Sequence, residues 1–159
     1  MSRHEARKHA FHLIFRMHFA VETTVDELAE SKQLYYDFIQ SGIDEVDGLE
    51  KLKRPTGKDA EYVDRVVYGV FDRMYVIDKV ISNFLRDWTI DRISSVDLAI
   101  MRLAIYEMLR EPDVPLPVAV NEAVELAKLY GDDDSPGFIG GLLGRVRDEL
   151  KAKGRDKND

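Results

Sequence analysis

The chain has 159 residues, 45% of them hydrophobic, and a formal net charge of −7 at pH 7. This length supports one domain with a single substantial core, and the acidic balance excludes a protein that coats nucleic acid by bulk attraction. The lack of cysteine excludes disulfides, thiolate metal sites and a cysteine nucleophile. No apolar run follows Met1, so we expect a cytoplasmic protein with neither a signal peptide nor a membrane anchor.

Residues 3–21 predict the first helix, because they contain no Gly or Pro and place apolar residues at helical spacing. One stripe of this helix is apolar and should face the core. A second face mixes aromatic and basic side chains, namely His4, Arg7, Lys8, Phe11, His12, Phe15 and Phe19. Arg3, Arg7 and Lys8 form a dense cationic cluster in an acidic chain, which favours a local contact with nucleic acid. An ordinary solvated helix face explains the charges equally well, and each phenylalanine is individually better explained as core.

The next segments are helical as well. Residues 24–40 predict a second helix, which Thr23 or Thr24 can cap and Ser41-Gly42 ends. Residues 42–58 are acidic and rich in turn formers, and they predict a connection with at most a short helical turn. Helical periodicity returns over 59–86, where one long helix and two helices in series both fit, because Gly69 and β-branched residues weaken the pattern.

Residues 94–109 predict the central helix of the fold. Ser94 or Ser95 can cap it, and the negative charge of Asp97 suits its first turn. At roughly 100° per residue the apolar side chains occupy all sides, so this helix must be mostly buried. A membrane span needs about 20 uninterrupted apolar residues, and Arg102 and Glu107 interrupt this segment. Other helices must therefore surround it.

Two further helices complete the pattern. A proline-stiffened connector over 111–117 leads to a helix over 117–130, which Gly131 ends. Residues 132–136 provide a cap followed by a proline at the first helical position, and a glycine-rich helix then runs to about residue 150. These glycines indicate either very close packing or a loosely held helix. Residues 151–159 predict a disordered polar tail.

No segment predicts a strand, so the expected fold class is all-α, a compact bundle of about seven helices within residues 1–150. No phosphate-binding glycine loop, nucleophile elbow or marked carboxylate pair is present, so we expect no enzyme. Glu5, His9 and His12 share a helix face, but three ligands within two turns converge poorly on one metal ion. A helix cap explains the aspartates at 132–134 more simply than a cation site does. We therefore expect no metal and no cofactor.

Several segments are similar to one known family. They share several of its polar residues in the same order along the chain, and not merely its apolar pattern. These are residues 91–93 (DRI), 96–107 (VDLAIMRLAIYE), 113–115 (DVP) and 118–128 (VAVNEAVELAK), followed by 131–135 and Phe138-Ile139. They closely resemble the C-terminal half of the transcription antitermination factors of the NusB family. The resemblance is strong over 91–143, moderate in the first helix through Ala6-Arg7 and Ala10, and weak over 22–60.

The resemblance implies an all-helical fold of two subdomains, here about 1–87 and 88–150. It implies binding of single-stranded boxA-type RNA from ribosomal RNA leaders, together with NusE, a small-subunit ribosomal protein. As part of an RNA polymerase antitermination complex, such a factor promotes processive transcription through terminators. It implies no cofactor and no membrane partner.

Residue roles follow from the same resemblance. The family uses an arginine-rich first helix for RNA, to which Arg7 corresponds directly and Arg3 and Lys8 approximately, whereas His12 and Phe15 stand where the family often has Gln and Tyr. Phe84, Asp134 and Phe138 fall at RNA-proximal positions, and Asp97 falls near the surface that meets NusE. Gly140 and Gly144 replace a usual Asn and Asp. Protonation of His4 and His12 beside Arg7 would add positive charge for RNA phosphates as the pH falls.

Two alternative functions compete with this interpretation, and only the second remains open. An RNA-binding helper segment of a ribosomal RNA methyltransferase would need a methyl-donor domain, for which 159 residues leave no room. A protein-only helical adaptor or homodimer would bury the first helix in a partner and not bind RNA, and the net acidity is compatible with it. The sequence fits a monomer and a homodimer alike.

Overall fold

A computed structural model describes residues 1–19, 24–41 and 53–154. In these ranges the chain forms seven α-helices and one 3-10 turn, with no strand, which confirms the predicted all-α class. The elements are α1 (Arg3–Phe19), α2 (Val25–Gln40), α3 (Gly57–Asp72), α4 (Met74–Asn83), η1 (Ile90–Arg92), α5 (Ser95–Arg110), α6 (Leu116–Tyr130) and α7 (Ser135–Ala152). Residues 20 and 21, predicted as the end of the first helix, and most of the predicted 42–58 connection lie outside the described residues.

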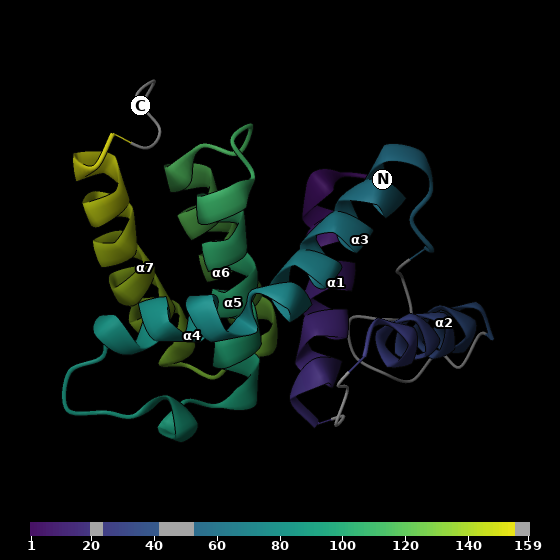
Figure 1. Cartoon of the computed structure of the whole chain (residues 1–159), viewed down its shortest axis with the longest axis horizontal. Helices are drawn as coiled ribbons and strands as arrows, with labels where there is room; N and C mark the ends of the chain where they lie inside the picture. The colour runs from purple at the N-terminus through teal and green to yellow at the C-terminus, as the bar shows by residue number, and fades with distance from the viewer. Residues whose placement is uncertain (20–23, 42–52, 155–159) are drawn as a thin grey trace.

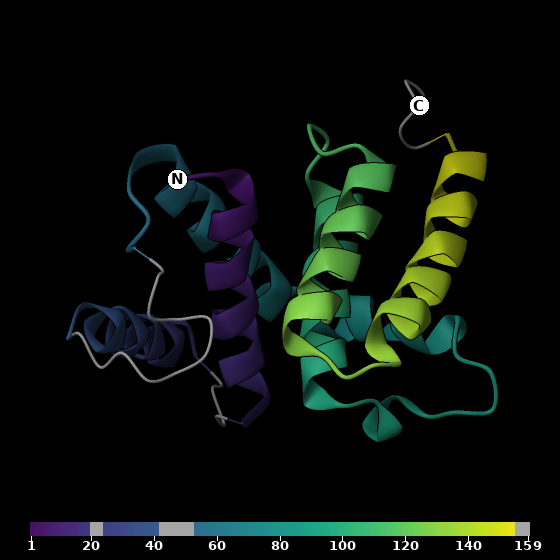
Figure 2. The same cartoon turned by 180° about the vertical axis from the view of Figure 1, so that it is seen from behind.

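Helix α5 is the centre of the fold, as its sequence predicts. Every residue from Asp97 to Met108 is buried, and α1, α3, α4, α6 and α7 all pack against this helix. In Figure 1, α4 crosses in front of α5. In the view from behind in Figure 2, α6 and α7 lie in front of α5 instead. The hydroxyl of Ser94 accepts a hydrogen bond from the backbone N–H of Asp97 at 3.1 Å, which confirms the predicted cap.

The periodic segment over 59–86 forms two helices in series. Arg73 separates α3 from α4 with φ −117° and ψ 20°, outside the helical region. Gly69, one turn earlier, lies directly under the ring of Tyr106 from α5. A Cβ atom at Gly69 would lie 2.2 Å from Cε2 of Tyr106, so only glycine permits this close approach of α3 and α5.

Helices α6 and α7 pack closely along each other. The cap of α7 comes from Asp132, whose Oδ1 accepts hydrogen bonds from the backbone N–H groups of Asp134 and Ser135. The helix begins at Ser135, so Pro136 is its second residue and not, as predicted, its first. Gly140 is tightly packed, because a Cβ there would lie 3.2 Å from Cγ2 of Val124, while Gly137 has open space around it.

The C-terminal end of the described structure corrects one expectation. Helix α7 continues through Lys151 and Ala152, which the sequence placed in a disordered tail, and residues 155–159 lie outside the described ranges. The subdomain boundary near residues 87 and 88 stays a prediction, since α3 and α4 both contact α5. Among the described helices, none is long and apolar enough to cross a lipid bilayer.

Candidate nucleic-acid interface

Helices α1 and α6 run side by side and in the same direction (Figure 2). His4 contacts Glu122 at the start of this seam, and His12 contacts Tyr130 at its end. Each pair is separated by 118 positions along the chain, which fixes the parallel register. We call the surface along these four residues, together with Arg3, Lys8, Phe15 and Phe19 of α1, the α1–α6 seam. Lys8 lies midway between the two histidines in i, i+4 steps, so it occupies the same face of α1.

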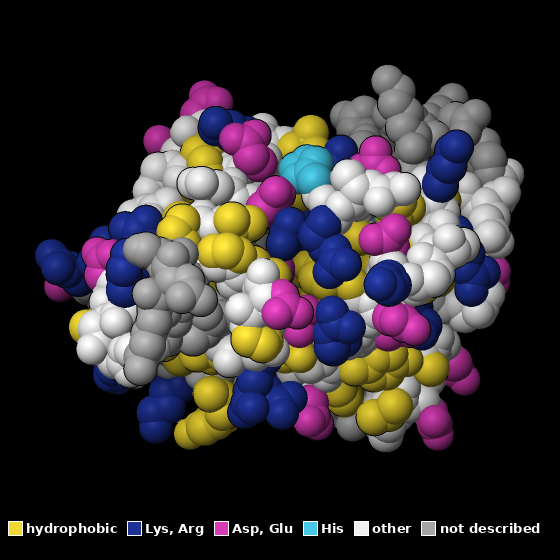
Figure 3. Space-filling model, turned by 90° about the horizontal axis from the view of Figure 1, so that it is seen from above, with side chains coloured by type: hydrophobic (Ala, Val, Ile, Leu, Met, Phe, Trp, Pro, Cys, Tyr) yellow, Lys and Arg dark blue, Asp and Glu magenta, His cyan; other side chains and the backbone are white. Residues whose placement is uncertain are grey.

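The first turns of α1 carry an exposed positive charge along this seam. Arg3 is exposed, and its guanidinium lies 4.2 Å from the centre of the Tyr62 ring, where a cation–π contact holds it. Lys8 is half-buried. Viewed from above, Lys and Arg side chains gather around the middle of the molecule next to a histidine, with acidic side chains among them (Figure 3). Because Arg3 is exposed and Lys8 only half-buried, contacts of these two cations with RNA phosphates stay a prediction.

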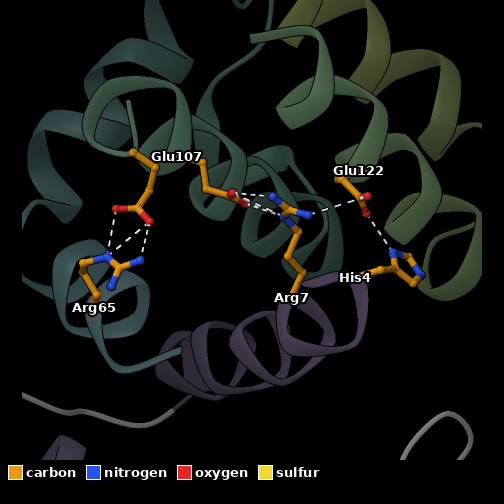
Figure 4. A network of polar contacts seen from close by, with 6 residues as sticks. His4, Arg7, Arg65, Glu107 and Glu122 are labelled. Atoms are coloured by element: carbon orange, nitrogen blue, oxygen red, sulfur yellow. Dashed lines mark hydrogen bonds and ion pairs between the residues drawn. The ribbon is translucent and has the colours of Figure 1, made fainter. Parts of the chain in front are cut away.

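Arg7 lies inside the molecule, with only 4% of its surface exposed. Its guanidinium donates to both carboxylate oxygens of Glu107 on α5, with Nε–Oε1 and Nη2–Oε2 distances of 2.9 Å, and Nη1 lies 3.6 Å from Oε1 of Glu122 (Figure 4). Burial by itself lowers the pKa of Arg7, but the hydrogen bonds and negative charge of Glu107 outweigh it and raise the pKa overall. The prediction that Arg7 contacts RNA directly does not fit this placement, because its donors are enclosed and paired. Arg7 fastens α1 to α5 and α6.

Glu122 connects this buried pair to the surface. One of its oxygens lies near Arg7, and the other lies 2.7 Å from Nδ1 of His4, whose side chain is 39% exposed (Figure 4). A protonated His4 is therefore partly neutralised by Glu122. This partner weakens the expectation that His4 supplies free positive charge to RNA at low pH.

His12 is enclosed by aromatic rings at the end of the seam. Its Nε2 lies 3.2 Å from the hydroxyl of Tyr130, and Tyr130 stacks on Phe11 with ring centres 4.7 Å apart. Burial, with the positive charges of His9 and Lys8, lowers the pKa of His12 from 6.5 to about 4. The prediction that His12 becomes charged near pH 6.5 is therefore wrong for the folded protein. A neutral His12 instead offers a polar ring edge held by Tyr130.

Phe15 continues the aromatic band toward the end of α1. It is half-buried and stacks on Phe11 at 5.9 Å, while Phe19 meets it edge-on and is 65% exposed. His9, by contrast, is buried and hydrogen-bonded to the hydroxyl of Tyr35 and the carbonyl of Lys53. In the described part of the chain, no group of three His, Asp or Glu side chains is arranged to hold a metal ion.

A second group of predicted residues surrounds a hollow of about 420 Å³ at the start of α7. It is lined by Trp88, Arg92, Ile93, Ser94, Asp97, Asp132, Asp134 and Phe138. Trp88 is 54% exposed and stacks on Phe138 with ring centres 6.1 Å apart. The structure thus brings together Asp97, Asp134 and Phe138, whereas Phe84 does not line this hollow and offers its carbonyl to Arg145.

Asp97 lies at the buried side of this hollow. It is only 8% exposed, and its Oδ1 has no hydrogen-bond partner among the described residues. Burial raises the pKa of Asp97, with hydrogen bonds from Ser135 and Ser94 opposing the shift and Asp132 adding to it. Asp134 is exposed at the rim, so a partner would reach it before Asp97.

Comparison with known proteins gives the family. The model of the NusB family matches residues 4–148. The chain belongs to the NusB family. It is 38% identical over 150 residues to the transcription antitermination protein NusB of Carboxydothermus hydrogenoformans, covering 94% of this chain and 95% of that protein. It is 50% identical over 101 residues to NusB of Acetivibrio thermocellus, covering 64% and 69% of the two chains.

Solved structures agree with the family. The structure of T. maritima NusB superimposes with a TM-score of 0.70 at 30% identity, covering 94% of this chain and 92% of that one. A crystal structure of NusB and NusE in complex with double-stranded RNA gives a TM-score of 0.74 at 20% identity, with 92% and 96% covered. At that identity the second likeness shows the fold alone.

The sequence analysis missed two side chains of this NusB family member that belong to the candidate interface, namely Tyr130 and Trp88. Tyr130 precedes the glycine that ends α6, and nothing in its local pattern indicates that it holds His12. Trp88 lies between α4 and η1, and its stacking on Phe138 depends on how α7 returns to that loop. Both contacts arise from tertiary packing across more than one helix. The seam and the hollow are connected through the end of α6, because Tyr130 is followed directly by the loop that carries Asp132 and Asp134.

Proposed function

We propose that this protein is a transcription antitermination factor that binds single-stranded boxA-type RNA of ribosomal RNA leaders together with NusE. In this role it is a cytoplasmic, non-enzymatic part of an RNA polymerase antitermination complex. Support comes from membership of the NusB family and from curated relatives that bear this name. The RNA-binding residues in this proposal are Arg3, His4, Lys8, His12, Phe15, Phe84 and Phe138, with Tyr130 added. Asp134, expected from the sequence to contact RNA, is assigned to the partner surface instead, because it lines the same hollow as Asp97.

The observation that carries the proposal is the combination of charge and rings along the α1–α6 seam. Arg3 and Lys8 provide cations for phosphates at one end. Half-buried Phe15 and exposed Phe19 provide ring surfaces on which unpaired bases can stack at the other end. Single-stranded RNA is recognised by this pairing of phosphate contacts with stacked bases. Arg7 supports the surface from beneath by holding α1 in place.

For NusE we propose the surface around the hollow, with Asp134 at its rim and Asp97 beneath. An acidic chain that offers few phosphate contacts should bind RNA weakly alone. A partner that adds its own RNA contacts makes the second binding event intramolecular and tightens the whole complex. NusE should therefore increase the RNA affinity of this protein.

The test is the anisotropy of a labelled boxA-type RNA titrated with the protein, with and without NusE. We expect tighter binding with NusE, and for Lys8→Ala a decrease of about 0.7 in the salt slope of log affinity. Lys151→Ala, an exposed cation at the end of α7, is the matched control and should leave the slope unchanged.

Asp134→Lys tests the partner surface in the same assay. It should remove the gain that NusE provides and leave binding to RNA alone unchanged or stronger. Failure of the folded protein to bind RNA even with NusE present contradicts the proposal. Burial of α1 in a dimer, detected as a doubled molecular mass by light scattering, would then favour the protein-only adaptor.

A further inference from the structure

In Figure 1, α3 passes into α4 in front of α5, on the face of the molecule opposite the α1–α6 seam. Residues of α3, α4 and α5 line a groove there. It consists of two adjoining hollows of about 310 Å³ each, which share Arg73 and Tyr106 as lining residues. We call it the Tyr106 groove. Each hollow is at the lower end of the volumes of known ligand pockets and is large enough for one big side chain.

The walls of the Tyr106 groove are mainly apolar. Val76, Ile77 and Leu109 line the half beside α4, and Val25, Tyr68 and Phe71 line the half beside α2 and α3. Val76 and Val25 are 53% and 58% exposed. Within the part of the chain that the structure describes, nothing covers these two large apolar side chains. Apolar side chains that are exposed together in this way mark interaction sites.

Arginines border the same groove. Arg65, Arg73 and Arg110 all lie close enough to Tyr106 for their charges to lower the pKa of its hydroxyl, although burial raises that pKa overall. Arg65 is neutralised by a two-pronged contact with Glu111 at 2.8 Å. Arg73 has only a 3.8 Å contact with Asp72, and no carboxylate of the described residues lies within 4.0 Å of exposed Arg110. Two positive charges are thus available in a chain of net charge −7.

We propose that the Tyr106 groove binds a short acidic peptide segment of a partner protein, with one large apolar side chain inserted beside Tyr106 and carboxylates paired with Arg73 and Arg110. Tyrosine and arginine beside apolar side chains are the residues that dominate protein–protein binding sites. Carboxylates fit the planar guanidinium groups in two-pronged pairs.

RNA fits this groove less well. Binding of single strands needs an open aromatic face on which bases stack. Tyr106 is only 5% exposed, and its ring lies on the backbone of Gly69, so its face is not open. Because the groove and the seam lie on opposite faces, a peptide and RNA can occupy the protein together.

A phage-displayed library of random dodecapeptides, selected on the immobilised full-length protein, tests this directly. We expect enriched peptides to place Asp or Glu beside Leu, Phe or Trp. A labelled copy of the most enriched peptide should bind in solution, and Arg73→Glu/Arg110→Glu should weaken its binding by roughly tenfold or more. Lys79→Glu, an exposed charge on α4 that does not line the groove, is the matched control and should bind the peptide like the parent.

Circular dichroism shows whether each variant is folded, and Val76→Asp provides an independent test of the apolar wall. No enrichment, enrichment without acidic residues, or equal peptide affinity in the parent and in folded Arg73→Glu/Arg110→Glu would each overturn the proposal. A loss of boxA RNA affinity in that variant, with peptide binding unaffected, would assign the groove to RNA instead. The RNA test of the proposed function uses Lys8 and is unaffected by the outcome here.

Discussion

The pairing of Arg7 with Glu107 places Arg7 in the core, and not on the surface where it was predicted to contact RNA. The guanidinium of Arg7 and the carboxylate of Glu107 are both almost fully buried, and each satisfies the other through hydrogen bonds. Such a pair adds little net stability compared with apolar residues, but breaking it leaves one buried charge without a partner. Its effect here is to fix α1 against α5.

Arg7→Ala should therefore lower the free energy of unfolding by about 3–5 kcal/mol, because Glu107 is left buried and charged. Urea denaturation monitored by circular dichroism measures this. Arg7→Met/Glu107→Leu is the control, since it removes both charges and should recover most of the loss. Equal stability of Arg7→Ala and the parent would contradict the structural role of Arg7.

His12 gives a pH dependence of stability with a defined sign. Its pKa is 6.5 in the unfolded chain and about 4 in the folded protein. As the pH falls, the unfolded state therefore binds a proton at His12 before the folded state does. The free energy of unfolding accordingly falls between about pH 6.5 and 4, by about 3 kcal/mol at most. His12→Gln should remove this part of the loss. An NMR titration that places the His12 imidazole pKa near 6.5 in the folded protein would refute this.

At the scale of elements, the close crossing of α3 over α5 depends on Gly69. Gly69→Ala should destabilise the protein by about 1–3 kcal/mol, because the new methyl group overlaps the Tyr106 ring. Gly137→Ala in α7 is the matched control: its Cβ meets open space, so it should stabilise the protein by about 0.5–1 kcal/mol. Thermal denaturation of the two variants tests both signs, and a destabilised Gly137→Ala or an unaffected Gly69→Ala would contradict the packing.

The helices were predictable from sequence because their signals are local. Periodicity identified α1, α2, α5, α6 and α7, and the apolar residues on every side of α5 predicted its central position. The partner of each polar residue was not predictable, since pairs such as Arg7 with Glu107 or His12 with Tyr130 lie at least 100 positions apart. Arg3 and Lys8 stay predicted RNA contacts, since one is exposed and the other half-buried. Arg7 was placed on the surface wrongly, because helical spacing alone does not show which neighbouring helix covers it.

At the scale of the whole molecule, we propose that separate faces bind separate partners. The α1–α6 seam carries positive charge and rings for RNA, the hollow at the start of α7 lies next to it for NusE, and the Tyr106 groove lies on the opposite face. Because a net charge of −7 disfavours RNA contacts over most of the surface, we expect the local cations of α1 to determine where RNA binds. This arrangement leaves the seam accessible while a protein partner is bound.

Amide chemical-shift mapping of the isotope-labelled protein in complex with NusE, on addition of boxA-type RNA, shows directly whether RNA binds along the α1–α6 seam. We expect the largest shifts at Lys8, Phe15 and Tyr130 along the α1–α6 seam. Bound RNA whose shifts are confined to Arg73 and Arg110 on the opposite face, with the seam unchanged, would contradict it.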